Sequence, residues 1–210
     1  MPRCWLLRHG SSHSNEAGAF ADSWSISITS AGHRQAREAA LRWSKIAPDA
    51  FRLFSSPMLR ALQTAQHIQA LFPHVLIEVI DDLHEFEPFD FSHLAPMRPV
   101  DRQPLMKSYW DTCNPDLVGE GKRAESFTHF RWRVEAALSR LGSSEVGTLA
   151  VCHGGVIKLA ELLLEPAPQH FNAGALMRSW MGQPTIQNCG LREVEFPINS
   201  AVPGMFGQKT

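Results

Sequence analysis

Two histidine-glycine pairs, His9-Gly10 and His153-Gly154, each follow a short apolar run of the chain. The first run is residues 5–7 and the second is residues 149–152, and both are typical of buried strands. Since the carboxyl ends of parallel strands meet at one edge of an open sheet, the two imidazoles can face one ligand. The glycine after each histidine lets a ligand come close to the backbone N–H groups.

Two arginines indicate the charge of that ligand. Arg8 directly precedes the first histidine, and Arg60 lies three positions after Pro57 of the sequence Ser55-Ser56-Pro57. Guanidinium groups bind phosphate oxygens in pairs, so we expect an anion, and specifically a phosphoryl group. The apolar residues 75–80 predict a strand that brings Glu85 into the same crevice.

Along the chain, short apolar runs typical of strands alternate with segments whose apolar residues have helical spacing. This order predicts an α/β fold with a mostly parallel sheet. Strands are expected at residues 4–7, 52–54, 75–80 and 148–152, with closing, antiparallel edge strands at 185–188 and 191–196. One helix carries Ala36, Ala39, Ala40 and Trp43 on one face, with Thr29 or Ser30 as its N-cap. Three more are expected from a Ser56-Pro57 cap to about Phe72, from Phe127 to Gly142, and from Val156 to Leu164.

Residues 88–123 lack this periodicity, and five prolines interrupt them. We expect no long element here, and interpret the segment as a loop-rich cap over the site, packed through its aromatic residues. With 210 residues, 44% of them hydrophobic, the chain is expected to form one domain, residues 1–210, with this cap inserted.

Charge and composition exclude several classes of partner. The formal net charge is −1, so no nucleic acid or membrane partner is expected, and the basic residues must act locally. No apolar stretch is long enough for a signal peptide or membrane span, which favours the cytoplasm. The four cysteines show no Cys-x-x-Cys spacing and are expected to be reduced. The oligomeric state is left open.

Six ordered blocks resemble the histidine phosphatase superfamily, which is phosphoglycerate mutase-like, and specifically its phosphatase branch. They are Arg8-His9-Gly10 with Asn15, Thr29-x-x-Gly32-x-x-Gln35-Ala36, Ser55-Ser56-Pro57-x-x-Arg60-Ala61-x-Gln63-Thr64-Ala65, Leu83-x-Glu85, Glu125-Ser126 and His153-Gly154-Gly155. The resemblance spans about Trp5 to Phe196 and implies a three-layer α/β/α sandwich. The implied activity is that of a histidine acid phosphatase-type phosphoric monoester hydrolase acting on a small phosphorylated metabolite.

The resemblance also implies the role of each matching residue. His9 resembles the nucleophile, which requires a neutral ring with its other nitrogen bound to a partner, for which we expect a main-chain carbonyl. Arg8, Arg60 and His153 resemble the donors around the phosphoryl oxygens, and Glu85 resembles the general acid. Two neutral donors are added by Asn15 and the backbone N–H of Gly154. No cofactor is implied.

Other interpretations stay open at this point. His9 and His13 have the spacing of some zinc sites, although they lie in a predicted loop, so no metal is expected. Glu125 fits a first-turn helix position and a pocket position equally well. The activity is alternatively that of a phosphoglycerate mutase-type enzyme, of a phosphoprotein phosphatase or of a non-catalytic phospho-ligand binding module. The cap residues Arg98, Arg102, Lys107, Lys122 and Arg123 could recognise a second anionic group.

The chain also departs from the family pattern. Ser11 stands where glutamate or glutamine is frequent, Ala124 stands where glycine is usual, and the stretch around Trp24 lacks the usual aspartate. These positions leave the choice of substrate open.

Overall fold

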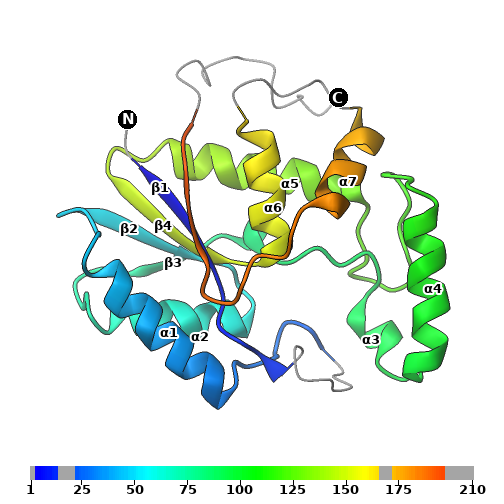
Figure 1. Cartoon of the computed structure of the whole chain (residues 1–210), viewed down its shortest axis with the longest axis horizontal. Coiled ribbons are helices and arrows are strands. Elements are labelled where there is room, and N and C mark those ends of the chain that lie inside the picture. The colour runs from blue at the N-terminus through cyan, green and yellow to red at the C-terminus, as the bar shows by residue number, and fades with distance from the viewer. Residues whose placement is uncertain (1–2, 14–21, 166–171, 197–210) are drawn as a thin grey trace.

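The computed structural model describes residues 3–13, 22–165 and 172–196. Within them the chain forms a five-stranded sheet and seven α-helices (Figure 1). In chain order these are β1 (Cys4–Arg8), α1 (Ser30–Trp43), β2 (Phe51–Ser55), α2 (Leu59–Gln69), β3 (Ile77–Val79), α3 (Phe91–Leu94), α4 (Pro99–Asp111), α5 (Phe127–Gly142), β4 (Gly147–Cys152), α6 (Gly154–Leu163), α7 (Ala173–Gly182) and β5 (Leu191–Val194). None of the described helices is long and apolar enough to cross a bilayer.

The sheet has the strand order β3-β2-β4-β1-β5, and only β5 runs antiparallel to its neighbour. Helices α1 and α2 cover one face, while α5, α6 and α7 cover the other (Figure 1). The expected three-layer α/β/α arrangement with a mostly parallel sheet is therefore confirmed. This order places β4 at the centre, between the strands that carry the other site residues.

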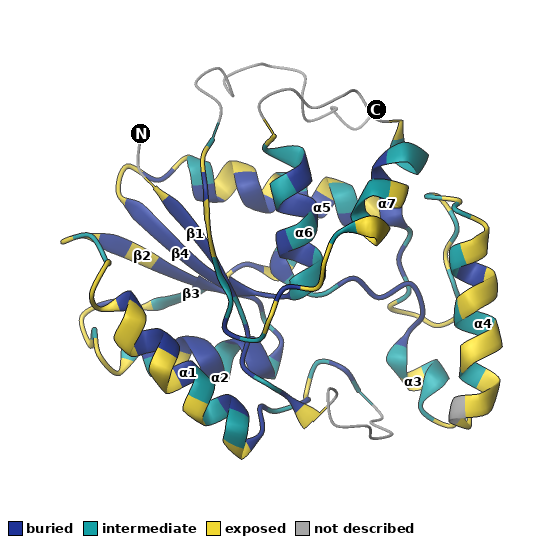
Figure 2. Ribbon diagram, viewed as in Figure 1, coloured by how far each residue is buried: buried dark blue, intermediate teal, exposed yellow. Residues whose placement is uncertain are grey.

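Both faces of the sheet are buried, which explains why its strands are continuous apolar runs rather than alternating ones. Leu6 and Ala150 point to the α5–α6 side, whereas Leu7 and Leu149 point to the α1–α2 side. Helix α1 turns its buried stripe toward the sheet and its exposed residues outward (Figure 2). Its N-cap is Thr29, whose side chain accepts a hydrogen bond from the N–H of Gly32.

The start of α2 differs from the sequence expectation. The helix begins at Leu59, its N-cap is Met58 without a side-chain cap, and Pro57 lies before it. The Ser56 hydroxyl does accept from the N–H of Met58 at 3.3 Å, but it also lies 2.8 Å from Nε2 of His153. Ser56 therefore belongs to the predicted site rather than to a helix cap.

The segment 88–123 contains more regular structure than its prolines indicate. Helix α4 is 13 residues long, with Pro99 at its first position and Pro104 inside it. A proline in the first position removes only an N–H that would be unbonded in any case, so it favours a helix start. The prediction of no long element here was wrong, because Pro99 starts the helix and the helix continues through Pro104 although that proline lacks an N–H. The segment lies to one side of the sheet layers (Figure 1).

The C-terminal part also needs correction. Residues 185–188 form no strand, and α7, which the sequence patterns did not predict, precedes them. The carbonyl of Ile186 accepts from the Arg8 guanidinium, and Asn188 Nδ2 donates to the carbonyl of His9 at 3.1 Å. The polar groups of this segment thus bind the end of β1 instead of forming a ladder. Only β5 pairs antiparallel with β1, as expected.

Candidate active site

The two histidines meet at the carboxyl edge of neighbouring strands. Arg8 of β1 pairs in register with Cys152 of β4, so His9 and His153 each follow one residue later. Their ring centroids are 5.1 Å apart, and both side chains are almost completely buried. The sequence prediction that strand ends bring them together is confirmed.

The hydrogen bonds of His9 define its tautomer. Nδ1 lies 2.7 Å from the carbonyl oxygen of Gly10, which can only accept, so Nδ1 carries the proton. Nε2 then keeps its lone pair, and Nε of Arg60 donates to it at 3.2 Å. Burial, together with the charges of Arg60 and Arg8, lowers the pKa of His9 to about 3. The ring is neutral, with a nucleophilic nitrogen facing a guanidinium.

Arg60 and Arg8 border this nitrogen from different elements. Arg60, in the first turn of α2, is buried and donates through Nη1 to the carbonyl of Ser23 at 2.7 Å. Arg8 donates to the carbonyl of Ile186, while its buried Nε has no hydrogen-bond partner among the described residues. Burial lowers the pKa of both guanidinium groups, and the negative charge of Glu85 opposes that shift.

His153 is held at the end of β4 by a side-chain hydrogen bond in addition to its ring contact with His9. Its Nε2 lies 2.8 Å from Oγ of Ser56, and its Nδ1 is buried without a partner in the described part of the chain. Burial, followed by the charge of Arg60, lowers the pKa of His153 well below its usual value. The ring is therefore a neutral group with one unused nitrogen beside His9.

Glu85 follows β3 and a 3₁₀ turn at Asp81–Leu83, and approaches the start of α6. Its Oε1 accepts from the N–H of Phe86 at 3.0 Å and its Oε2 from the N–H of Gly155 at 3.2 Å. A Cβ on Gly155 would lie 2.4 Å from Oε1, so only glycine leaves room for the carboxylate there. The expectation that Glu85 enters this crevice is confirmed.

Glu125 does not take the first-turn helix position that its sequence context allowed. It precedes the N-cap of α5, Ser126, and pairs in the interior with Arg133 of the same helix, with Nη2 and Oε1 2.5 Å apart. Burial raises the pKa of Glu125, but the hydrogen bond and charge of Arg133, together with His84 and His129, lower it overall. The sequence did not indicate Arg133, because an arginine on an amphipathic helix is usually solvated.

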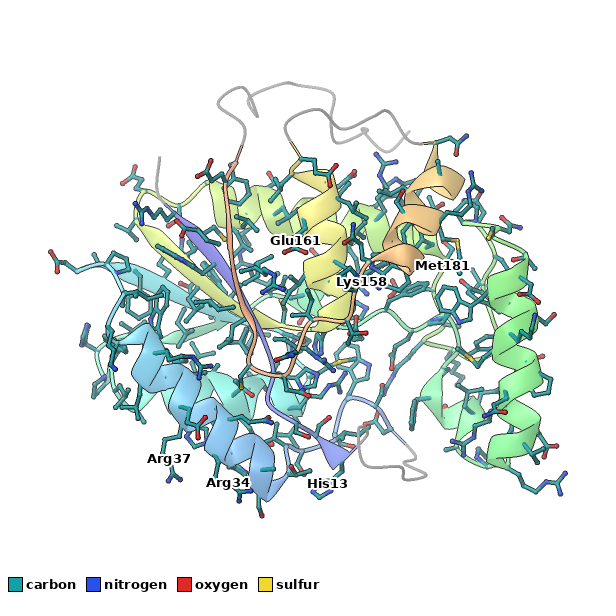
Figure 3. The ribbon with its side chains drawn as sticks, viewed as in Figure 1. His13, Arg34, Arg37, Lys158, Glu161 and Met181 are labelled. Atoms are coloured by element: carbon teal, nitrogen blue, oxygen red, sulfur yellow. The ribbon has the colours of Figure 1, made fainter. Side chains whose placement is uncertain are left out.

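Two further charged side chains that interact electrostatically with site residues were not predicted. Glu87 is buried, accepts a hydrogen bond from the Ser23 hydroxyl, and accepts from Trp24 Nε1 at 3.1 Å. Burial raises the pKa of Glu87, opposed by these two donors and by the charge of Arg60. Lys158 of α6 places its Nζ 4.6 Å from the centre of the Trp180 ring, reaching toward α7 (Figure 3). Neither residue belongs to a sequence block that could have indicated it.

Gly10 does not have the expected role of exposing its backbone N–H to a ligand. Its N–H donates to Oγ1 of Thr64 at 3.1 Å and is therefore not directed at a ligand. A Cβ there would lie 2.6 Å from the carbonyl oxygen of Gly32, so the glycine permits the loop after β1 to pack on α1. At Gly154, in contrast, a Cβ would make only ordinary contact with Arg8.

The remaining candidates lie apart from the site or cannot be placed. Asn15 falls outside the described residues. No group of three or more potential metal ligands occurs among the residues that the structure describes, His9 and His13 included.

Four of the five basic residues between 98 and 123 have partners of their own. Arg98 pairs with Asp101, Lys107 pairs with Asp111, and Arg123 pairs with Asp22. The fourth, Arg102, donates to the carbonyls of Met97 and Ala95 at 2.8 and 2.9 Å.

The chain matches the model of the histidine phosphatase superfamily (branch 1) over residues 4–196. It is 30% identical over 172 residues to an adenosylcobalamin/alpha-ribazole phosphatase of Salmonella typhi, covering 79% of this chain and 81% of that protein. The protein of the same name from Escherichia coli strain K12 is 26% identical over 174 residues, with the same shares covered. An alpha-ribazole phosphatase crystal structure from Shigella flexneri has the same fold, with a TM-score of 0.70 at 22% identity over 93% of this chain and 91% of that one. The chain therefore belongs to the histidine phosphatase superfamily.

Proposed function

We propose that the protein hydrolyses phosphomonoesters through a phosphohistidine on Nε2 of His9. The observation that carries this proposal is the neutral ring of His9, whose Nε2 lone pair faces the Arg60 guanidinium beside the buried ring of His153. Four buried side-chain polar atoms lack a partner among the described residues, and two of them are Arg8 Nε and His153 Nδ1. A buried polar nitrogen gains free energy when it acquires a hydrogen-bond partner, and a bound phosphoryl group can supply one. We assign both nitrogens to the binding of an oxyanion beside His9.

In the first half of the reaction, Nε2 of His9 attacks phosphorus, the P–N bond forms and the ester P–O bond breaks. Arg8, Arg60 and His153 donate to the three phosphoryl oxygens, and Arg60 Nε releases the lone pair that it contacts in the free protein. Glu85 protonates the leaving oxygen, which would otherwise depart as an alkoxide. The donors of Gly154 and Asn15 complete the proposed binding set.

In the second half, Glu85 removes a proton from water, and the water oxygen attacks phosphorus. The P–N bond breaks, its electron pair returns to Nε2 of His9, and inorganic phosphate leaves. Because fixed guanidinium charge does here what a divalent ion does in many phosphoryl-transfer enzymes, the proposed cycle requires no metal.

The histidine acid phosphatase-type behaviour is part of the same proposal. A pKa of about 3 keeps His9 unprotonated, and hence nucleophilic, in moderately acidic solution. The relatives named as adenosylcobalamin/alpha-ribazole phosphatases support a small phosphorylated substrate. We accordingly place segment 88–123 over the leaving-group side of the site, within a single domain.

The test is phosphate release from a panel of phosphorylated metabolites and 4-nitrophenyl phosphate, with and without EDTA. We expect turnover by the wild type in EDTA, none by His9→Ala, and full activity of the control His74→Ala, which replaces an exposed histidine. Acid quenching during turnover should trap protein carrying one phosphoryl group, absent from His9→Ala. Binding without phosphate release would contradict the proposal in favour of a binding module. Isomerisation without release would favour a mutase.

A further inference from the structure

A cavity of about 260 Å³ adjoins the candidate site and extends under segment 88–123. We propose that it receives the alcohol part of the substrate and selects phosphomonoesters whose alcohol part is uncharged and apolar, with Glu87 excluding a second negative charge. This inference rests on the proposed function and adds the substrate class to it.

The position of the cavity relates it to the leaving group. Arg60 and Glu85, which we assign to the phosphoryl oxygens and to the leaving oxygen, both line it. The alcohol part of a phosphomonoester begins at the leaving oxygen, so a substrate bound at His9 directs that part along Glu85. The cavity is the space next to this position.

The wall of the cavity is mainly apolar. It includes Phe86 directly after Glu85, and Phe89, Phe91, Leu94 and Met106 from segment 88–123. Apolar, concave walls with few polar groups gain affinity by removing apolar ligand surface from water. A carboxylate or second phosphate placed there would lose its hydration without a compensating partner.

The charges at the cavity also disfavour a second anion. Glu85 and Glu87 both line it, and Arg60 is the one basic residue among its described lining residues. Arg60 already has a role at the phosphoryl group, where its Nε contacts His9. A second anionic group would therefore face Glu87 without a free cation to pair with.

The basic residues of segment 88–123 do not change this balance. None of Arg98, Arg102, Lys107, Lys122 and Arg123 is among the described lining residues, and four of them are bound elsewhere. Lys158 lies over the Trp180 ring and is not among the described lining residues either. The alternative left open by the sequence, that the five basic residues recognise a second anion, is thus not supported by their positions.

The cavity wall is held in place before any substrate binds. The N–H of Gly119 donates to the carbonyl of Pro88 at 2.9 Å, and the N–H of Glu125 donates to the carbonyl of Glu87 at 3.0 Å. Glu87 itself is fixed by Ser23 and Trp24. A carboxylate held in this way cannot turn aside for an incoming anion, which strengthens its selectivity.

The test compares 2-phenylethyl phosphate with 2-(4-carboxyphenyl)ethyl phosphate at pH 7.5, since these esters differ only in a remote carboxylate. We expect kcat/KM to be about tenfold or more higher for the uncharged ester, with the difference mainly in KM. Glu87→Gln can keep the contacts to Ser23 and Trp24 without the charge, and should reduce the ratio to about threefold or less. The control Glu120→Gln, which changes an exposed acidic residue of the same segment, should keep the wild-type ratio.

A second variant tests the same idea by adding charge. Met106→Lys places a cation in the wall and should raise kcat/KM for the carboxylated ester relative to the uncharged one. Equal or better turnover of the carboxylated ester by the wild type, or an unchanged ratio in Glu87→Gln, would overturn the inference while leaving the proposed function intact. If none of the three substrates, the two esters and 4-nitrophenyl phosphate, released phosphate, the proposed function would be overturned and the inference with it.

Discussion

Arg133 and Glu125 form a buried two-point ion pair, with Nη2–Oε1 and Nε–Oε2 distances of 2.5 and 2.9 Å. The same guanidinium donates to the carbonyl oxygens of Asp82, His84 and Glu85 at 2.8, 2.6 and 3.2 Å. Arg133 therefore ties the turn before the proposed general acid to helix α5. The position of Glu85 depends on a residue that lines no part of the cavity described above.

Arg133→Ala should destabilise the protein strongly and weaken catalysis. Removing one partner of a buried ion pair typically costs about 3–5 kcal/mol, because the other charge stays buried and unpaired. Urea unfolding should show this loss as a lower midpoint, and phosphate release should fall as Glu85 moves. The control Arg131→Ala removes an arginine that pairs with Glu135 on the same helix and is one-third exposed, and it should cost about 1 kcal/mol or less. Equal losses in the two variants would contradict this assignment.

Ser56→Ala should weaken the binding of phosphate. The variant leaves Nε2 of His153 without its partner at 2.8 Å, so the ring loses the hydrogen bond that fixes its orientation. We expect a loss of stability of about 1–3 kcal/mol from the unpaired buried nitrogen. Inhibition constants for inorganic phosphate should rise by about tenfold. Unchanged phosphate inhibition in a folded Ser56→Ala protein would remove Ser56 from the site.

The lowered pKa of His9 predicts a pH dependence of stability. Its value falls from 6.5 to about 3 on folding, so the unfolded chain takes up the proton first as the pH decreases. Stability should therefore decrease between pH 6.5 and 3, by up to about 1.4 kcal/mol per pH unit from this group. His9→Asn can keep the donor to Gly10 and should show a smaller decrease, measured by urea unfolding at pH 7 and 4.5. The same slope in both proteins would show that His9 does not contribute.

Activity should follow the same pKa. The ring of His9 stays neutral in acid. The rate at which 4-nitrophenyl phosphate forms the phosphoenzyme should therefore not fall through protonation of His9 as the pH decreases past 6.5. Nitrogen NMR of histidine-labelled protein, with His9→Asn to assign the signal, should show the Nδ1-protonated neutral ring at pH 5. A signal that titrates with a midpoint near 6.5 would contradict the burial-driven shift.

The strand ends could be predicted from sequence because each strand is marked by a local apolar run, and no tertiary contact alters its conformation. Apolar runs buried on both faces of a sheet identify β1 and β4, and their order places His9 and His153 at one edge. The tautomer partner of His9 also followed from chemistry, since a main-chain carbonyl can fix a neutral ring in this way. These features depend on residues that are neighbours in sequence or in register.

The errors came where a tertiary contact overrides a local preference. Ser56 is of a residue type that favours helix caps, but it also lies against His153, 97 positions away in sequence. The segment 185–188 has strand composition, but its polar groups bind Arg8 and His9. Arg133 gave no sequence signal at all, because its partners come from a turn and from the residue before its own helix cap. A single sequence does not encode such pairings in its spacing.

Gly155 offers the sharpest test of how Glu85 is positioned. In Gly155→Ala the new Cβ would lie 2.4 Å from Oε1 of Glu85 and 3.1 Å from the Trp180 ring, so the carboxylate must move away from the leaving oxygen. We expect the pattern of Glu85→Gln, with a loss of about 100-fold or more on alkyl phosphates, which need a protonated leaving group. The loss on 4-nitrophenyl phosphate should be about tenfold or less, since its leaving group is stable as an anion.

The matched control for Gly155→Ala is Gly182→Ala at the end of α7, where a Cβ would meet nothing within 4 Å. Steady-state kcat/KM on both substrate types should be unchanged in that variant, which separates a steric effect on Glu85 from a general effect of replacing a helical glycine. Equal losses on alkyl and 4-nitrophenyl phosphates in Gly155→Ala and in Glu85→Gln would mean that Glu85 acts on phosphorus or on folding. Its assignment to the leaving oxygen would then have to be abandoned, because only proton donation makes the size of the loss depend on the leaving group.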